Sequence, residues 1–172
     1  NRYKNQFPEL KVSIGDTPSS TICTNFNGVD EIRPGNFIFY DIMQYQLGVC
    51  DIDDIALRVV CPVVAKHQSR NEIVIYGGAI HFSKEYLINN AGKKFFGRII
   101  INNNGVKTLL SERNYVSSLS QEHGLLKVSQ KNFQIFNIGD LVEIIPIHSC
   151  LTANLFRKYF TTEGEEIPMI NS

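Results

Sequence analysis

Short runs of β-branched and apolar residues, separated by turn-forming residues, dominate the chain from residue 55 onward. β-Branched residues favour extended backbone, whereas Gly, Asn and Asp favour turns. The pattern predicts strands over residues 55–61, 72–76, 95–101, 125–129 and 141–145. The turn-forming stretch 102–105, Asn-Asn-Asn-Gly, is typical of a hairpin. Short strands at this spacing predict a mainly β fold, either a barrel or a sandwich.

Helical periodicity is scarce, and the first 40 residues differ in character from the rest. We expect helices only over residues 83–89, with Ser83 as the N-cap, and over 150–155. Residues 9–14 and 31–40 predict two strands, joined by a loop that begins with the turn signature Asp-Thr-Pro. Two strands and a loop do not make a domain, so we expect this chain to be a fragment of a longer one.

Composition and charge point to an ordinary globular protein. The chain has 172 residues, of which 43% are hydrophobic and 20% are charged. Because 17 basic residues balance 17 acidic ones, no net field draws the chain to nucleic acid or to a membrane surface, and we expect neither partner. The cysteines are widely separated, so we expect reduced thiols in a cytoplasmic protein; they are Cys23, Cys50, Cys61 and Cys150.

His148 and Cys150 lie two positions apart near the end of the last predicted strand. In an extended segment both side chains leave the backbone on the same face. An imidazole and a thiolate that converge in this way suit Zn²⁺, and two protein ligands leave positions open for water and substrate. The spacing alone fits a buried histidine and a buried free cysteine as well. Both interpretations therefore stay open on the residues alone.

Three motifs, in order along the chain, resemble one family of enzymes. Residues 31–41, Glu-Ile-Arg-Pro-Gly-Asn-Phe-Ile-Phe-Tyr-Asp, resemble the segment that leaves the catalytic barrel in the D-threonine aldolase and D-serine dehydratase-like family. Residues 120–124, Ser-Gln-Glu-His-Gly, resemble that family's Ser-Glu-Glu-His-Gly. Residues 146–155 resemble its Pro-Asn-His-x-Cys-Pro-Thr-x-Asn signature. The shorter Arg-Pro-Gly core also resembles alanine racemase.

The resemblance implies a pyridoxal-phosphate enzyme of fold type III, in which a (β/α)8 barrel is followed by a β-rich C-terminal domain. It implies that residues 1–40 are a remnant of that barrel, with its last two strands and their loop, and that residues 41–172 are the C-terminal β domain. The family's Schiff-base lysine lies on the first barrel strand. No lysine of this chain takes that position, so we expect the chain alone to be inactive.

The same resemblance implies roles for named residues. His148 and Cys150 would bind Zn²⁺ or another divalent metal, which acts as a Lewis acid on the substrate's β-hydroxyl. Pyridoxal phosphate would serve as the electron sink. Its phosphate contacts would come from Gly15, Thr17, Gly35 and Asn36, although ordinary turn chemistry also explains these positions.

Some neighbouring residues qualify these roles. Asp16 would repel a phosphate, so we expect its carboxylate to point away from it. Ile147 and Leu151 stand where the family has Asn and Pro, which affects substrate preference rather than the two metal ligands.

Four further residues are candidates, three of them because they resemble positions of related enzymes. His81 lies about where alanine racemase places its catalytic tyrosine across the dimer, and it could act as a general acid or base. A partly exposed loop histidine explains His81 equally well. His123 matches a family residue without assigned chemistry, and His67 is expected in a solvated hairpin loop. Arg33 matches an arginine that approaches the pyridine nitrogen in alanine racemase, or it ties the barrel bottom together.

The sequence thus predicts a fragment of a lyase that acts on small D-β-hydroxy amino acids, and the intact protein is expected to be a homodimer. The metal pair does not choose between aldolase and dehydratase chemistry, because both need the metal in the same place. Two alternatives stay open: an amino-acid racemase of the alanine racemase type, which needs no zinc, and a non-catalytic dimerisation domain.

Overall fold

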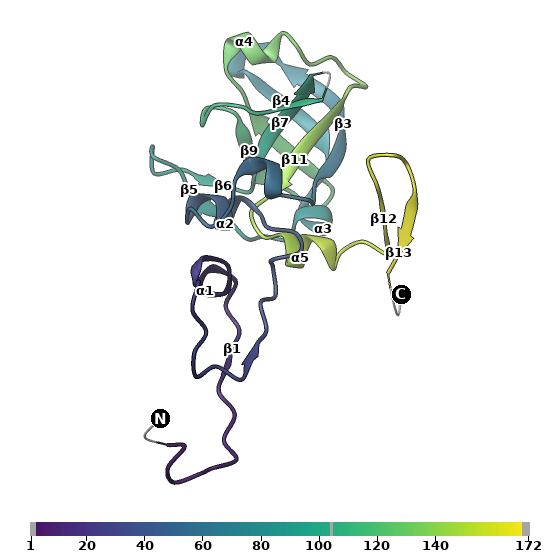
Figure 1. Ribbon diagram of the computed structural model, residues 1–172. Coiled ribbons are helices and arrows are strands. Elements are labelled where there is room, and N and C mark those ends of the chain that lie inside the picture. Colours follow the sequence, from purple (N-terminus) through teal and green to yellow (C-terminus); the bar gives the residue numbers. More distant parts are fainter. Residues whose placement is uncertain (1–2, 104, 170–172) are drawn as a thin grey trace.

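A closed antiparallel barrel forms the body of the molecule in the computed structural model, which describes residues 3–103 and 105–169 (Figure 1). The barrel strands are β3 (Val59–His67), β4 (Glu72–Tyr76), β7 (Gly97–Asn103), β9 (Tyr115–Leu119), β10 (His123–Lys127) and β11 (Leu141–Pro146). They pair in the order β11-β3-β4-β10-β9-β7, and β11 also pairs with β7, which closes the ring. The predicted mainly β fold is therefore confirmed, as a barrel.

Smaller elements surround the barrel. The helices are α1 (Thr17–Ile22), α2 (Ile42–Gln46), α3 (Ala79–Phe82), α4 (Gln130–Phe133) and α5 (Ser149–Ala153), with 3-10 turns η1 (Ile52–Asp54) and η2 (Gln68–Arg70). The remaining strands are β1 (Ser13–Ile14), β2 (Glu31–Ile32), β5 (Leu87–Ile88), β6 (Lys94–Phe95), β8 (Val106–Leu109), β12 (Lys158–Phe160) and β13 (Glu166–Pro168).

The predicted strands of the barrel match the observed ones to within a few residues. β4 has the predicted bounds, whereas β3 begins at Val59 rather than at residue 55. β10 ends at Lys127 because Ser129 instead caps α4, its hydroxyl accepting a hydrogen bond from the Asn132 N–H. β7 and β8 pair as an antiparallel hairpin. Asn104, in the predicted turn between them, lies outside the described residues.

Several local predictions are wrong. No helix spans residues 83–89, because Ser83 adopts a positive φ of 62° that ends α3 and residues 87–88 form β5. The predicted turn at Asp16 is instead the start of α1, since the Asp16 carboxylate caps the Ser19 N–H. The predicted strand 31–40 stops at Ile32. The expected helix near residues 150–155 is present as α5.

Two clusters of buried side chains hold the β domain together. The larger cluster fills the barrel with side chains from all six of its strands, and Ile73, Ile75, Val116, Leu126 and Ile144 in it are fully buried. The smaller cluster packs α2 and its flanking loops against the outside of β7 and β11 through Ile42, Ile55, Phe95, Ile100, Ile145 and Ile147. The smaller cluster therefore fixes the start of α2 beside the end of β11.

The N-terminal segment, residues 3–38, extends away from the barrel (Figure 1). β1 and β2 pair in parallel, and α1 lies between them in the chain. This β-α-β order is the arrangement expected for consecutive strands of a (β/α)8 barrel. The predicted division of the chain at residue 40 stays a prediction. None of the helices in the described part of the chain is long and apolar enough to cross a bilayer.

Candidate functional site

Asp41 is the centre of a buried network where the N-terminal segment meets the barrel domain. Its side chain is fully buried and caps α2, because Oδ1 accepts a hydrogen bond from the Gln44 N–H at 2.9 Å. Its other oxygen, Oδ2, accepts from Asn36 Nδ2 at 2.5 Å and from the Ser149 N–H at 2.9 Å. One carboxylate thus joins three segments that are far apart in the sequence.

Asn36 connects this carboxylate to the candidate metal ligand Cys150. A carboxylate only accepts hydrogen bonds, so Asp41 fixes the Asn36 amide with Nδ2 toward itself. Asn36 Oδ1 then faces Cys150 and lies 3.4 Å from its Sγ, within reach of a thiol donor. The Asn36 backbone N–H donates to Thr17 Oγ1 at 3.0 Å. Asn36 is therefore bonded on three sides.

Ser149, between the two candidate ligands, is fully buried. Its hydroxyl donates to the Tyr40 carbonyl at 2.5 Å, and its N–H donates to Asp41. Tyr40 has a positive φ of 47°, an unfavourable conformation for a residue with a side chain. Its phenol lies 3.2 Å from Thr21 Oγ1, so Tyr40 links α1 to α5. The backbone strain at Tyr40 lies at the contact between the two regions.

The candidate metal ligands lie at the start of α5, not in a strand. His148 is the N-cap residue, with extended backbone at φ −131° and ψ 104°, and Cys150 lies in the first helical turn. The pair therefore does not lie in one continuous extended segment, because the chain turns into a helix at Ser149. His148 Nδ1 accepts a hydrogen bond from the Leu151 N–H at 3.3 Å. Both side chains are half-buried.

The donor chemistry of this pair fits a cation site that is completed by other ligands. Burial raises the pKa of the Cys150 thiol, and the charge of Asp41 raises it further, so a thiolate there needs a positive partner such as a metal ion. Imidazole and thiolate are preferred zinc ligands. Within residues 3–103 and 105–169, no group of three or more His, Cys, Asp or Glu side chains could hold a metal. Two protein ligands leave coordination positions open to water and substrate, as a catalytic zinc site requires.

The residues predicted to contact a phosphate lie together around α1 and the loop before Asp41. Thr17 and Asn36 are buried and bonded to each other, and a Cβ on Gly35 would meet nothing within 4 Å. Gly15 lies at the end of β1, where a Cβ would make an ordinary contact with the Arg33 carbonyl. The structure brings these four residues together, and their contact with a phosphate stays a prediction.

The Asp16 carboxylate occupies the beginning of α1, where it accepts from the Ser19 N–H at 2.7 Å. This hydrogen bond lowers the Asp16 pKa, so the group is an anion at neutral pH. An approaching phosphate would therefore meet a negative charge at this helix end, and Gly35 offers the more open approach.

His81 lies on α3 in a cluster of rings. Its ring centroid is 5.3 Å from that of Tyr76 and 6.1 Å from that of Phe156, and Tyr76 also contacts His123 at 5.7 Å. His81 Nδ1 accepts from the Gly78 N–H at 3.1 Å, and desolvation lowers the His81 pKa. A neutral imidazole is therefore favoured, and a catalytic role stays a prediction.

Two other singled-out residues have local roles in the described chain. Arg33 Nε donates to Ser13 Oγ at 2.8 Å and pairs with Glu31 at 2.7 Å, so it bridges β1 and β2. His67 ends β3 and precedes η2, at the predicted connection between strands. The contacts of Arg33 fit the proposed structural tie between the last barrel strands.

Sequence reasoning missed Asp41 and Ser149, which are both fully buried and are bonded to each other at the centre of the site. The position of Asp41 before the short helix α2 was the available signal, since aspartate is a preferred N-cap. Its second role, binding Ser149 across 108 positions of sequence, has no local signal.

Comparison with known proteins shows that this chain is similar to parts of amino-acid dehydratases. A family model described as "Putative serine dehydratase domain" matches residues 56–162. A D-serine dehydratase from Dictyostelium discoideum is 33% identical over 177 residues, which cover 94% of this chain and 41% of the relative. A D-threo-3-hydroxyaspartate dehydratase from Delftia sp. strain HT23 is 25% identical over 154 residues, covering 86% and 40%. The chain thus spans about two fifths of the length of these relatives.

Solved structures share the fold. An alanine racemase-like protein from Idiomarina loihiensis superposes with a TM-score of 0.79 at 26% identity, covering 96% of this chain and 45% of that one. The Delftia dehydratase gives 0.79 at 22% identity, covering 97% and 46%. Two related structures are dehydratase variants in which a histidine, and a cysteine two positions after it, are each replaced by alanine. The cysteine variant is described as metal-free.

Proposed function

Because this chain belongs to the serine dehydratase domain family, we propose that it forms the C-terminal part of a lyase acting on a small D-β-hydroxy amino acid. Removal of the β-hydroxyl, as in the dehydratases it resembles, is the preferred reaction, and aldol cleavage is the alternative. The observation that carries the proposal is the His148–Cys150 pair, fixed by Ser149 at the junction between the barrel domain and the N-terminal segment.

We propose that His148 and Cys150 hold a divalent metal ion, Zn²⁺ by the chemistry of the donors. The His-x-Cys spacing equals the separation of the two substituted residues in the dehydratase variants, which supports the assignment. A cation bound here supplies Lewis-acid polarisation of the substrate's β-hydroxyl. For ligation through Nε2, the His148 Nδ1 must carry the proton and give up its contact with the Leu151 N–H.

The chain's own residues prepare this site before any ligand binds. Asp41 and Ser149 hold the first turn of α5, and Asn36 faces Cys150 Sγ from one side. Gly35 leaves open space beside them for the cofactor. Pyridoxal phosphate, when bound, supplies the electron sink for the substrate carbanion. We propose that the lysine that would carry it is not among these 172 residues, so we assign the activity to a full-length protein and propose that it is a homodimer.

The reaction can be tested on the full-length protein with D-serine and D-threonine, before and after treatment with a chelator. A dehydratase releases ammonia together with a 2-oxo acid, which is pyruvate from D-serine. An aldolase releases glycine and acetaldehyde from D-threonine. We expect either activity to be lost on metal removal and regained with Zn²⁺. Amino-acid racemisation that survives the chelator would contradict the proposal and favour the racemase alternative.

The ligand assignment has its own test. We expect Cys150→Ala and His148→Ala each to lower kcat by about 10³-fold, because Lewis-acid catalysis contributes several kcal/mol and each 1.4 kcal/mol is tenfold. Cys23→Ala and His67→Ala are matched controls, since Cys23 is exposed and His67 ends a strand of the barrel. Bound zinc, measured by mass spectrometry, should fall in the first pair only. Equal zinc content in all four variants would disprove the assignment.

A further inference from the structure

We propose that Ser149 is the positioning residue of the metal pair, held in place by Asp41 and Tyr40. The inference rests on the proposed metal-binding role of His148 and Cys150. It adds a function for the residue between them, which neither motif nor spacing assigns. Metal affinity at this site would then depend on two hydrogen bonds that the metal ligands themselves do not make.

The geometry restrains Ser149 from two directions. Its backbone N–H donates to Asp41 Oδ2 at 2.9 Å, and its hydroxyl donates to the Tyr40 carbonyl at 2.5 Å. Both acceptors belong to neighbouring residues of the loop that precedes α2. Since one bond holds the main chain and the other holds the side chain, the peptide units on either side of Ser149 cannot rotate freely. These two peptide units end at the Cα atoms that carry the His148 and Cys150 side chains.

The acceptor at Asp41 is itself rigid. Its carboxylate is fully buried and binds three donors, from Asn36, Gln44 and Ser149. Asn36 also lies against Cys150 Sγ, so the network touches one candidate ligand directly and both through Ser149. When all the hydrogen-bond partners of a buried carboxylate are donors, the carboxylate has a single favourable arrangement. The Asp41 carboxylate therefore keeps its position when His148 and Cys150 bind a metal ion.

Outside support is needed because α5 has only five residues, too few to be stable as an isolated helix. Near its C-terminal end, Thr152 Oγ1 donates to the Phe82 carbonyl at 3.3 Å. The first turn, which carries the ligands, depends on Ser149. Groups that orient metal ligands from outside the coordination sphere change metal affinity by about 10- to 100-fold when they are mutated.

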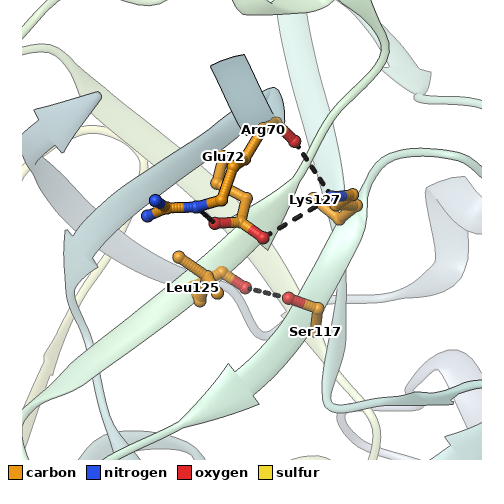
Figure 2. Close-up of polar contacts among 5 residues, drawn as sticks. All are labelled: Arg70, Glu72, Ser117, Leu125 and Lys127. Carbon is orange, nitrogen blue, oxygen red and sulfur yellow. Dashed lines mark hydrogen bonds and ion pairs between the residues drawn. The ribbon is translucent and has the colours of Figure 1, made fainter. Parts of the chain in front are cut away.

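The test compares Ser149→Ala with Ser117→Ala in the full-length protein. Ser117 also donates its hydroxyl to a backbone carbonyl, that of Leu125 at 2.9 Å, but between β9 and β10 of the barrel (Figure 2). Each variant loses one hydrogen bond of the same type, so both should lower the thermal midpoint by similar amounts. Only Ser149→Ala should weaken Zn²⁺ binding, by about 10- to 100-fold in competition with a chromophoric chelator.

Cobalt gives a readout that a purely structural role would not change. With Co²⁺ as the probe, we expect the thiolate-to-cobalt absorption band to weaken or shift in Ser149→Ala and to be unchanged in Ser117→Ala. Wild-type Zn²⁺ affinity together with a wild-type cobalt band in Ser149→Ala would overturn the positioning role. Wild-type protein that binds neither ion would instead overturn the proposed metal site itself.

Hydrogen exchange tests the same contact without a substitution, which matters if Ser149→Ala fails to fold. In full-length wild-type protein without added metal, the Ser149 amide should exchange slowly because it is bonded to a buried carboxylate. Exchange of this amide at the rate of an unstructured peptide would show that Ser149 is not fixed in advance, and would overturn the proposal.

Discussion

The barrel encloses a core of large apolar side chains, whereas the N-terminal segment leaves several of its own exposed. In the barrel, Ile73 and Leu126 are fully buried. In the N-terminal segment, Tyr3 is 64% exposed, Phe7 60% and Ile38 63%. Both regions contain large apolar side chains, so the difference lies in the partners that each region finds within the described residues.

The difference in burial follows from how the strand edges are paired in each region. Each barrel strand is bonded on both sides, and the β11–β7 pairing removes the last free edges. β1 and β2 have two residues each and pair only with each other. A short two-stranded pair is marginal in water without further strands or a covering layer. The barrel thus buries its core between paired strands, whereas the N-terminal segment leaves apolar surface exposed in the described part of the chain.

The largest test of this comparison is a pair of isoleucine truncations. Ile73→Ala should destabilise the chain by about 2–5 kcal/mol, because it leaves a cavity in the barrel. Ile38→Ala removes the same atoms from an exposed position and should change the free energy of unfolding by less than about 0.5 kcal/mol. Urea unfolding of both variants measures the difference. If Ile38→Ala lowered the free energy of unfolding as much as Ile73→Ala does, the contrast between a buried barrel core and an exposed N-terminal segment would be wrong.

A pair of glycine substitutions gives a smaller effect. A Cβ on Gly97, at the seam between β7 and β11, would lie 2.7 Å from Ile144 Cγ2 and 3.0 Å from the Ile145 carbonyl. Gly97→Ala should therefore cost about 1–3 kcal/mol through overpacking. Gly35→Ala has open space and should stabilise by about 0.4–1 kcal/mol by restricting the unfolded chain.

Thermal unfolding of both glycine variants separates these expectations. A stabilising Gly97→Ala would show that the barrel seam is loose. In the full-length protein, cofactor affinity provides an additional measurement for Gly35→Ala. A loss of cofactor binding without a loss of stability would support the predicted contact at Gly35, because the added methyl group occupies only the open side.

The sequence predicted the barrel region well because its signal is local. Runs of β-branched residues located β4 with correct bounds and β7 and β11 to within two residues. Closure into a barrel rather than a sandwich depends on the pairing of β11 with β7, which are about 40 positions apart, and no local pattern encodes it.

Prediction failed where a helix-start signal resembles a turn signal. Asp16 before Thr17-Pro18 fits both, and the Asp16 hydrogen bond to the Ser19 N–H decides for α1. For the metal pair, the helix expected from residue 150 begins one residue earlier, at Ser149, so that only His148 has extended backbone. The pair was found from its residue types, but its surroundings were not, since Asp41 meets Ser149 only in the folded chain.

The smallest expected effect concerns pH and separates the two regions by their histidines. The N-terminal segment has none, whereas His81 lies on α3 of the barrel domain with a pKa that desolvation lowers below the ordinary 6.5. As pH falls through the window between the unfolded and folded pKa, the unfolded chain takes up a proton that the folded chain does not. Folding stability should therefore fall with pH in that window.

His81→Asn isolates this contribution, because an amide oxygen can still accept the Gly78 N–H but does not titrate. We expect the free energy of unfolding, measured between about pH 5 and 7, to depend less steeply on pH in His81→Asn than in wild type. His67→Asn, at the end of β3, is the matched control. Parallel curves for His81→Asn and wild type would mean that water reaches the His81 ring. The half-buried position of His81 on α3 would then not desolvate its ring, and the contrast between the barrel and the N-terminal segment would not extend to the titration of this histidine.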